Sequence, residues 1–279
     1  MPKNTDLIRF LEPDIKALTL SYLRDKEVID NNSIIINEFT VGGFSRRVDL
    51  VIFTKGKLIA FEIKSEADSL TRLNGQINTY LEYFDKVIVV ADKKFTSKIQ
   101  ENSPKNVGLW EVSSTKIKIK NRGKTKKKVT NARLIDMMDV VDLSKLASKL
   151  KLRVDKQRSY LVKSLLSVSN KQLRLGVEAA LTRKYKNASA AFLKTTKSRK
   201  ILKEDLTVLS RFKLHRDYQK QKIKQNKIFW SNIDDHVTAL TKFVSDHQQA
   251  SQTNPPNPHP YQQVHHQQNR NRAAYEDVY

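Results

Sequence analysis

The pattern of hydrophobic and polar positions predicts a mixed α/β domain in the first 120 residues. Apolar side chains recur every three or four positions where we expect helices, and they form short runs rich in Val, Ile and Phe where we expect strands. The expected elements are a helix at about 7–24, strands at 34–39, 46–53 and 57–64, a helix at about 69–83, and strands at 86–91, 107–112 and 116–120. The first helix should start or be interrupted near Pro13, because proline breaks a helix interior.

The second half of the chain has a helical pattern and ends in a polar tail. Residues 131–246 contain few Gly and no Pro, and apolar residues recur in groups such as Leu161, Leu165 and Leu166. From residue 247 onward Gln, Asn, Pro and His predominate, which predicts a disordered tail. The expected parts are therefore an α/β domain at 1–120, a basic linker at 121–130, a basic all-helical domain at 131–246 and a tail at 247–279.

The net charge of the chain indicates what kind of partner it binds. The chain carries 52 Lys and Arg against 29 Asp and Glu, a formal net charge of +23. Eight basic residues and no acidic residue lie between 116 and 128. Such an excess favours a polyanionic partner, above all nucleic acid, which would bind Lys124, Lys126, Lys127 and Lys128 through its phosphates. The alternative for this stretch is a linker that only adds solubility.

Composition also excludes several classes of protein. Because the chain has no Cys, it has no disulfide framework, no thiolate zinc site and no cysteine nucleophile. No run of 18 apolar residues occurs, so we expect no membrane span, and the first residues lack the pattern of a secretory signal. We therefore expect a cytoplasmic protein that does not bind a membrane.

The predicted hairpin at 46–64 carries the most informative chemistry. With residues 55–56 as a two-residue loop, the strand register places Asp49 opposite Glu62. Two carboxylates that face each other in an apolar sheet repel, and a bound divalent cation would remove the repulsion. Together with the backbone carbonyl of Ile63 they form an oxygen site suited to Mg²⁺ or Mn²⁺.

Two further charged residues extend this candidate site. Lys64 shares a strand face with Glu62, where its ammonium could orient or deprotonate a water and stabilise charge that develops on a phosphate. Glu38 lies at the end of the preceding strand and is either a third carboxylate of the site or a charge that faces water. Taken together, these groups point to the hydrolysis of phosphodiester bonds.

Asp49 and the segment Glu62-Ile63-Lys64 resemble the active-site motif of the PD-(D/E)XK, or restriction-endonuclease-like, nuclease superfamily. The expected order of helix, three strands, helix and strand is also the core order of that superfamily. Arg-Arg-Val stands before Asp49 where the motif name gives Pro. Gln76 and Tyr80 match the Gln-X-X-X-Tyr element of nuclease domains associated with recombination helicases. The resemblance implies a restriction-endonuclease-like α-β-β-β-α-β mixed sheet.

A longer string over about the first 115 residues resembles a poorly characterised bacterial family within this superfamily. The string comprises Arg46-Arg47-Val48-Asp49-Leu50, Glu62-Ile63-Lys64-Ser65, Asp68-Ser69-Leu70-Thr71-Arg72-Leu73, Gln76, Tyr80, Phe84-Asp85 and Val107-Gly108. The resemblance implies that Gln76 and Tyr80 position a metal ligand or a phosphate. It says nothing about the helical half of the chain.

Three sets of candidate residues follow from these patterns. The expected catalytic residues are Asp49, Glu62, Lys64, Glu38, Gln76 and Tyr80; the expected metal ligands are Asp49, Glu62 and Ile63; and the expected nucleic-acid-binding residues are Arg46, Arg47, Arg72, Lys124, Lys126, Lys127 and Lys128. Arg72, Gln76 and Tyr80 fall on one stripe of the second helix, which an ordinary solvated face would also explain. Of Arg46 and Arg47, one should face solvent or phosphate while the other packs the aliphatic part of its side chain.

The expected function is that of a Mg²⁺- or Mn²⁺-dependent nuclease, with DNA as the first choice of substrate. One alternative is a nucleic-acid-binding protein that keeps the fold without catalysis. Another is a nuclease subunit that cuts only in a complex, as a homodimer or with a protein bound to its helical half. Tyr83, Tyr185 and Trp230 could stack on bases, but we expect each to pack in the core.

Overall fold

The structure is a computed structural model in which some segments are described and others are not. It describes residues 10–43, 45–113, 116–126, 128–155, 157–210, 222–223, 225–234 and 236–242. Lys127 and the tail expected at 247–279 therefore lie outside the described residues. The chain divides into two units, Met1–Arg216 and Asp217–Tyr279.

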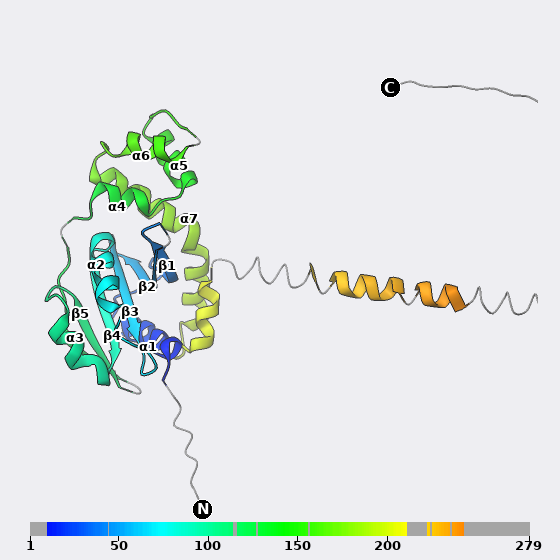
Figure 1. The fold of residues 1–279 in the computed structure, drawn as a ribbon, viewed down its shortest axis with the longest axis horizontal. Coiled ribbons are helices and arrows are strands. Elements are labelled where there is room, and N and C mark those ends of the chain that lie inside the picture. The colour runs from blue at the N-terminus through cyan, green and yellow to red at the C-terminus, as the bar shows by residue number, and fades with distance from the viewer. Residues whose placement is uncertain are drawn as a thin grey trace, which may run out of the picture. The chain divides into compact units, whose positions relative to one another are not determined.

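The first unit contains strands and helices up to residue 121 and helices alone after it (Figure 1). Its elements are α1 (Glu12–Asp25), β1 (Ile34–Val41), β2 (Arg46–Thr54), β3 (Lys57–Lys64), α2 (Leu73–Tyr83), β4 (Lys86–Asp92), η1 (Lys93–Phe95), α3 (Thr96–Asn102), β5 (Gly108–Ser113), β6 (Lys116–Asn121), α4 (Asn131–Asp136), α5 (Val140–Lys149), α6 (Arg158–Leu165), α7 (Asn170–Thr196) and η2 (Lys203–Leu209). All elements predicted before residue 121 are present. Pro13 does not interrupt α1, because it lies in the first turn, where its missing N–H has no helical partner to lose.

The strands form one mixed sheet in the order β1-β2-β3-β4-β5-β6. The β1/β2, β2/β3 and β5/β6 pairs are antiparallel, whereas β3/β4 and β4/β5 are parallel. The predicted hairpin register is confirmed from Thr54↔Lys57 to Leu50↔Phe61. Because α2 and α3 connect the parallel strands, the chain folds as a mixed α/β unit.

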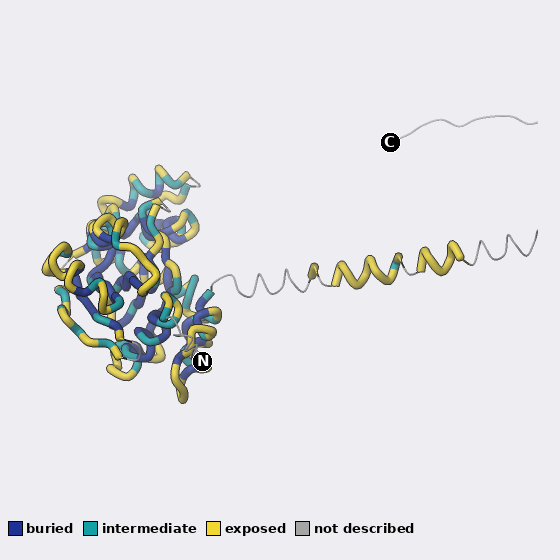
Figure 2. Tube along the Cα trace, turned by 60° about the horizontal axis from the view of Figure 1, so that its bottom comes forward, coloured by how far each residue is buried: buried dark blue, intermediate teal, exposed yellow. Residues whose placement is uncertain are grey.

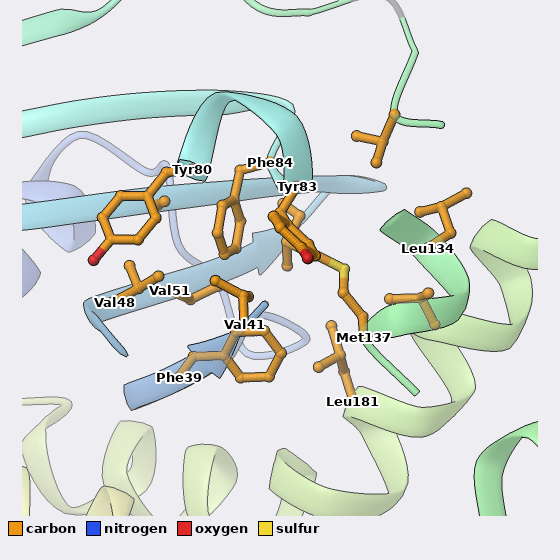
Figure 3. Close-up of a cluster of buried hydrophobic side chains, with 14 of the residues drawn as sticks. Phe39, Val41, Val48, Val51, Tyr80, Tyr83, Phe84, Leu134, Met137 and Leu181 are labelled. Carbon is orange, nitrogen blue, oxygen red and sulfur yellow. The ribbon is translucent and has the colours of Figure 1, made fainter. Parts of the chain in front are cut away.

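Hydrophobic side chains cover both faces of the sheet. On one face, α1, the end of α7 and η2 pack on residues such as Phe61 and Ile63. On the other face, α2 packs on β1 and β2 (Figure 3). Figure 3 shows this cluster, which contains Phe39, Val41, Val48, Val51, Tyr80, Tyr83 and Phe84 together with Leu134, Met137 and Leu181 from the later helices.

The helices after residue 130 belong to the same unit as the sheet, so the structure differs from the expected separate helical domain at 131–246. Helix α7 runs beside β1 (Figure 1). Ser189 of α7 accepts the N–H of Ile35 at 2.9 Å and donates to its carbonyl at 3.1 Å. Arg174 of α7 contacts the buried Asp85 at 2.6 Å. The apolar faces of these helices therefore complete the core of the sheet, and the division between units falls at residue 216.

The segment expected as a basic linker at 121–130 is attached to the sheet. The backbone N–H of Lys124 donates to the carbonyl of Asn106 at 2.8 Å, and that of Lys126 donates to the carbonyl of Asp85 at 2.6 Å. Gly123 has a φ of +65°, and a Cβ there would lie 2.4 Å from the N atom of Gly108. The segment therefore follows the end of the sheet at which β4 and β5 begin.

The second unit is helical over residues 222–223, 225–234 and 236–242. Most of its described residues are exposed along the whole segment (Figure 2). Among the helices that the structure describes, none has the length and apolar character needed to cross a bilayer.

Candidate active site

Asp49 lies where the backbone pairing of β2 and β3 ends. The last backbone pair is Leu50↔Phe61, and the next N–H of β3 that points toward β2 belongs to Ile63. The carboxylate of Asp49 accepts this N–H at 2.7 Å. The regular pairing thus ends one position before the predicted pair of Asp49 and Glu62, and the side chain of Asp49 replaces a backbone carbonyl as the acceptor.

Glu62 and Lys64 form a buried charge pair on the α2 face of β3. Glu62 is 1% exposed, and its Oε1 atom lies 2.8 Å from Nζ of Lys64. The same Nζ atom lies 3.3 Å from Oε1 of Gln76 on α2. The second carboxylate oxygen of Glu62, Oε2, is buried and has no hydrogen-bond partner among the described residues. A buried carboxylate oxygen without a donor is unusual and marks the position where a cation would be most favourable.

The surroundings of the two carboxylates raise the pKa of each. Burial, followed by the charge of Glu62, raises the pKa of Asp49 to about 7. Burial also raises the pKa of Glu62, although the ammonium of Lys64 opposes this change. Both carboxyl groups are therefore harder to ionise than exposed ones, and a bound cation would stabilise their charged forms.

Of the three residues predicted to share one face of α2, Arg72, Gln76 and Tyr80, only two lie at this site. Gln76 contacts Lys64 as described, whereas Arg72 is exposed at the start of the helix. Tyr80 is fully buried, which differs from a solvated polar stripe, and its hydroxyl donates to the carbonyl of Arg47 at 2.9 Å. Burial and the nearby charge of Glu62 raise the pKa of Tyr80. Tyr80 therefore ties α2 to β2 directly beside the carboxylates.

Glu38 lies level with Asp49 in the sheet but is not part of a three-carboxylate group. The β1/β2 register passes from Asn37↔Leu50 to Phe39↔Val48, with Glu38 in the left-handed region at a φ of +63°. Its exposed carboxylate lies 3.3 Å from Arg47. Among the described residues no three His, Asp or Glu side chains are close enough to hold a metal together. Glu38 is therefore not a third carboxylate of the site, and the candidate metal ligands remain Asp49, Glu62 and the carbonyl of Ile63.

Two residues of α1 that the sequence did not single out lie near Asp49. Lys16 is 3% exposed and contacts Glu12 at 2.6 Å. The charge of Lys16 lowers the pKa of Asp49, and that of Glu12 raises it, although both effects are smaller than those of burial and of Glu62. In the sequence these residues have the i,i+4 spacing of an ordinary surface ion pair, so only the packing of α1 on the sheet reveals their position.

The predicted nucleic-acid-binding residues fall into two groups. Arg46 and Arg47 flank the carboxylates: Arg47 is exposed, and the guanidinium of Arg46 lies over α2, 3.3 Å from where a Cβ on Gly75 would be. Arg47 thus faces solvent, where it pairs with Glu38, and Arg46 packs against α2, which is the division that we predicted for the two arginines. Lys124, Lys126 and Lys128 are exposed and follow the opposite end of the sheet. Since Lys64 pairs with Ala91 and Ile59 with Lys86, this end lies about 16 Å along the strands from the candidate site.

Basic side chains also gather at that far end. Burial, followed by the charges of Lys57 and Arg122, lowers the pKa of Lys86. These like charges lie together beside the segment that contains Lys124 and Lys126. The far end of the sheet is therefore strongly positive, although it is separate from the carboxylates.

The first comparison with known proteins concerns solved structures. A protein of unknown function from Silicibacter pomeroyi, SPO1766, is similar over 59% of this chain and 90% of its own, with a TM-score of 0.34 and 19% sequence identity.

Comparison of sequences gives a closer relationship. Protein cII of Enterobacteria phage P4 is 39% identical over 117 residues, which are 40% of this chain and 44% of that protein. The matched part thus spans less than half the length of this relative. The family described as Bacteriophage P4 protein cII matches residues 6–210, about three quarters of the chain and nearly the whole first unit. The chain therefore belongs to the Bacteriophage P4 protein cII family.

Proposed function

We propose that this protein is a metal-dependent nuclease that hydrolyses phosphodiester bonds, with DNA as its substrate and a restriction-endonuclease-like core. The observation that carries the proposal is the buried Oε2 atom of Glu62, which has no donor among the described residues and lies in the same charged pocket as Asp49. The order α1-β1-β2-β3-α2-β4 and the positions of Asp49, Glu62 and Lys64 at the end of a hairpin support it.

The donor set fits a hard divalent cation that keeps several waters. Asp49 and Glu62 supply carboxylate oxygens, and Ile63 supplies a carbonyl. Because the N–H and C=O of one residue in a strand point to the same side, that carbonyl is directed toward the edge where the N–H of Ile63 meets Asp49. Mg²⁺ or Mn²⁺ bound there would polarise a phosphodiester and lower the pKa of a bound water.

The remaining residues have supporting tasks. Lys64 holds an ammonium beside Glu62 and Gln76, where it can orient a water and stabilise negative charge on a phosphate. Gln76 restrains that ammonium through its side-chain oxygen. Tyr80 fixes the distance between α2 and β2 through the Arg47 carbonyl, so it positions the pocket and does not itself react.

Basic residues at both ends of the sheet would bind the substrate backbone. Arg46 and Arg47 lie two or three residues before Asp49 on β2, Arg72 is exposed at the start of α2, and Lys124, Lys126 and Lys128 lie at the far end. A separation of about 16 Å corresponds to about five base pairs of duplex, so one nucleic acid can contact both groups. We therefore assign affinity to the basic residues and hydrolysis to the carboxylate pocket.

A substrate panel tests the proposal. Full-length protein would be incubated with linear, circular, single-stranded and branched DNA and with RNA, in Mg²⁺, Mn²⁺ or EDTA. We expect cleavage of at least one DNA in the metal ions and none in EDTA. Glu62→Gln should bind but not cut, while Glu66→Gln, a change at an exposed neighbour, should cut like wild type. Binding without cleavage by wild type in either metal would contradict catalysis and point to the non-catalytic alternative.

A further inference from the structure

The helical segment of the second unit carries a regular apolar seam. Large hydrophobic residues or a single Asn occupy positions spaced three and four residues apart over almost the whole segment. These positions are Ile223, Asn226, Trp230, Ile233, Val237 and Leu240. The alternating spacing of three and four is the heptad repeat of a coiled coil. Ile223, Trp230 and Val237 take the a positions, two of them β-branched. Asn226, Ile233 and Leu240 take the d positions, two of them Ile or Leu.

The seam has nothing to cover it within the described part of this unit. Ile223, Trp230, Val237 and Leu240 are 66%, 61%, 54% and 64% exposed. Phe229 widens the seam and packs its ring edge-on against Trp230, whereas Ile228 falls outside it. Trp230, which we expected in the core, is therefore part of an open apolar surface. A helix of about three heptads with such a surface is marginal alone in water and gains most of its stability from a partner.

We propose that the segment 222–242 pairs with the same segment of a second copy of this chain as an antiparallel coiled coil. A self-complementary seam needs no other protein, because an antiparallel pair sets Ile223 against Leu240 of the partner and Trp230 against Ile233 of the partner. The third pair in this register is Asn226 against Val237 of the partner, so apolar contacts close the seam at its two ends and at its centre.

Charges beside the seam select the antiparallel arrangement. Lys227 and Asp234 occupy equivalent flanking positions one heptad apart. In the antiparallel pair each Lys227 lies beside an Asp234 of the other copy, which forms two ion pairs. In a parallel pair Lys227 would instead lie beside Lys222 of the other copy, and the like charges would repel. Dimerisation would bring two first units into one assembly, independently of whether they are nucleases.

The mass of the full-length protein in solution tests the pairing. Light scattering or sedimentation should give twice the 32.2 kDa of one chain for wild type. Val237→Asp combined with Leu240→Asp should give a single chain, and the matched change Ser231→Asp with Thr238→Asp, outside the seam, should remain a dimer. A monomeric wild type, or a seam variant that remains a dimer, would overturn the proposal.

Cross-linking tests the direction of the two helices without disrupting the seam. Because the chain contains no Cys, a single introduced Cys is its only thiol. Under mild oxidation, a mixture of Ile223→Cys and Leu240→Cys proteins should form mixed disulfide dimers, and each protein alone should form few. Efficient cross-linking of each protein with itself would establish a parallel pair and contradict the antiparallel arrangement.

Discussion

Replacing Asp49 by Asn should stabilise the protein when no divalent cation is bound. Burial and the charge of Glu62 raise the pKa of Asp49 from 3.8 to about 7, so the folded state holds a proton more tightly than the unfolded chain does. The stability contributed by protonated Asp49 is complete below its unfolded pKa and is lost as the pH rises through about 7. A difference of about three pKa units sets an upper limit of about 4 kcal/mol.

The Asn side chain removes this dependence while it keeps the local structure. Its oxygen can still accept the N–H of Ile63, the contact that Asp49 makes at 2.7 Å. Part of the effect belongs to Glu62, whose pKa is also raised, so we expect wild type to lose about 1 to 3 kcal/mol more than Asp49→Asn between about pH 5 and pH 8. Urea unfolding in EDTA at the two pH values measures this difference.

The same unfolding measurements with a divalent cation added test whether Asp49 binds the metal. At tens of times its dissociation constant, Mg²⁺ or Mn²⁺ should stabilise wild type by about 2 kcal/mol at pH 8. Asp49→Asn should gain little, because the ligand and the repulsion disappear together. Equal pH dependence in the two proteins would refute the raised pKa of Asp49. A full metal-induced shift in Asp49→Asn would show that the ion binds elsewhere.

Other changes test the packing and the charges. Tyr80→Phe removes the donor to the carbonyl of Arg47 and should lower the free energy of unfolding, measured in urea, by about 1 to 2 kcal/mol. An unchanged value would mean that the bond does not hold α2 in place. Arg174→Gln leaves the buried Asp85 without its cation and should lower the free energy of unfolding by about 2 kcal/mol. The sheet and the helices should still unfold in one transition, and two separate unfolding transitions would contradict a single unit. Charge reversal to Glu at Lys124, Lys126 and Lys128 should flatten the dependence of nucleic-acid affinity on salt, by about one unit of slope for each phosphate that the protein no longer binds. An unchanged salt dependence would mean that these three lysines only make the protein more soluble.

Much of the sheet follows from local patterns in the sequence. The two-residue turn between β2 and β3 fixes their register, because the length of the loop sets which residues of the two strands face each other. The same register places Asp49 level with Glu62, so the core of the candidate site is predictable from the hairpin alone.

The features that the sequence did not reveal depend on long-range packing. The helical pattern of α7 is the same whether it packs on a sheet or on other helices, so its contact with β1 was not predictable. Tyr80 lies at a helical position shared with polar residues, yet its ring enters the core and only its hydroxyl meets Arg47. The left-handed backbone of Glu38 is a further case, since non-glycine residues rarely adopt it and no local sequence signal announced it.

A single-turnover cleavage rate for Lys64→Ala tests the proposed chemistry most directly. The substrate would be the DNA that wild type cuts best, with Mn²⁺ present and with Lys163→Ala, a change at an exposed residue of α6, as the matched control. Because Lys64 is the cation beside Glu62 and Gln76, we predict a rate at least about 100-fold lower than wild type, with DNA binding retained. Cleavage by Lys64→Ala at the wild-type rate would contradict the proposed mechanism.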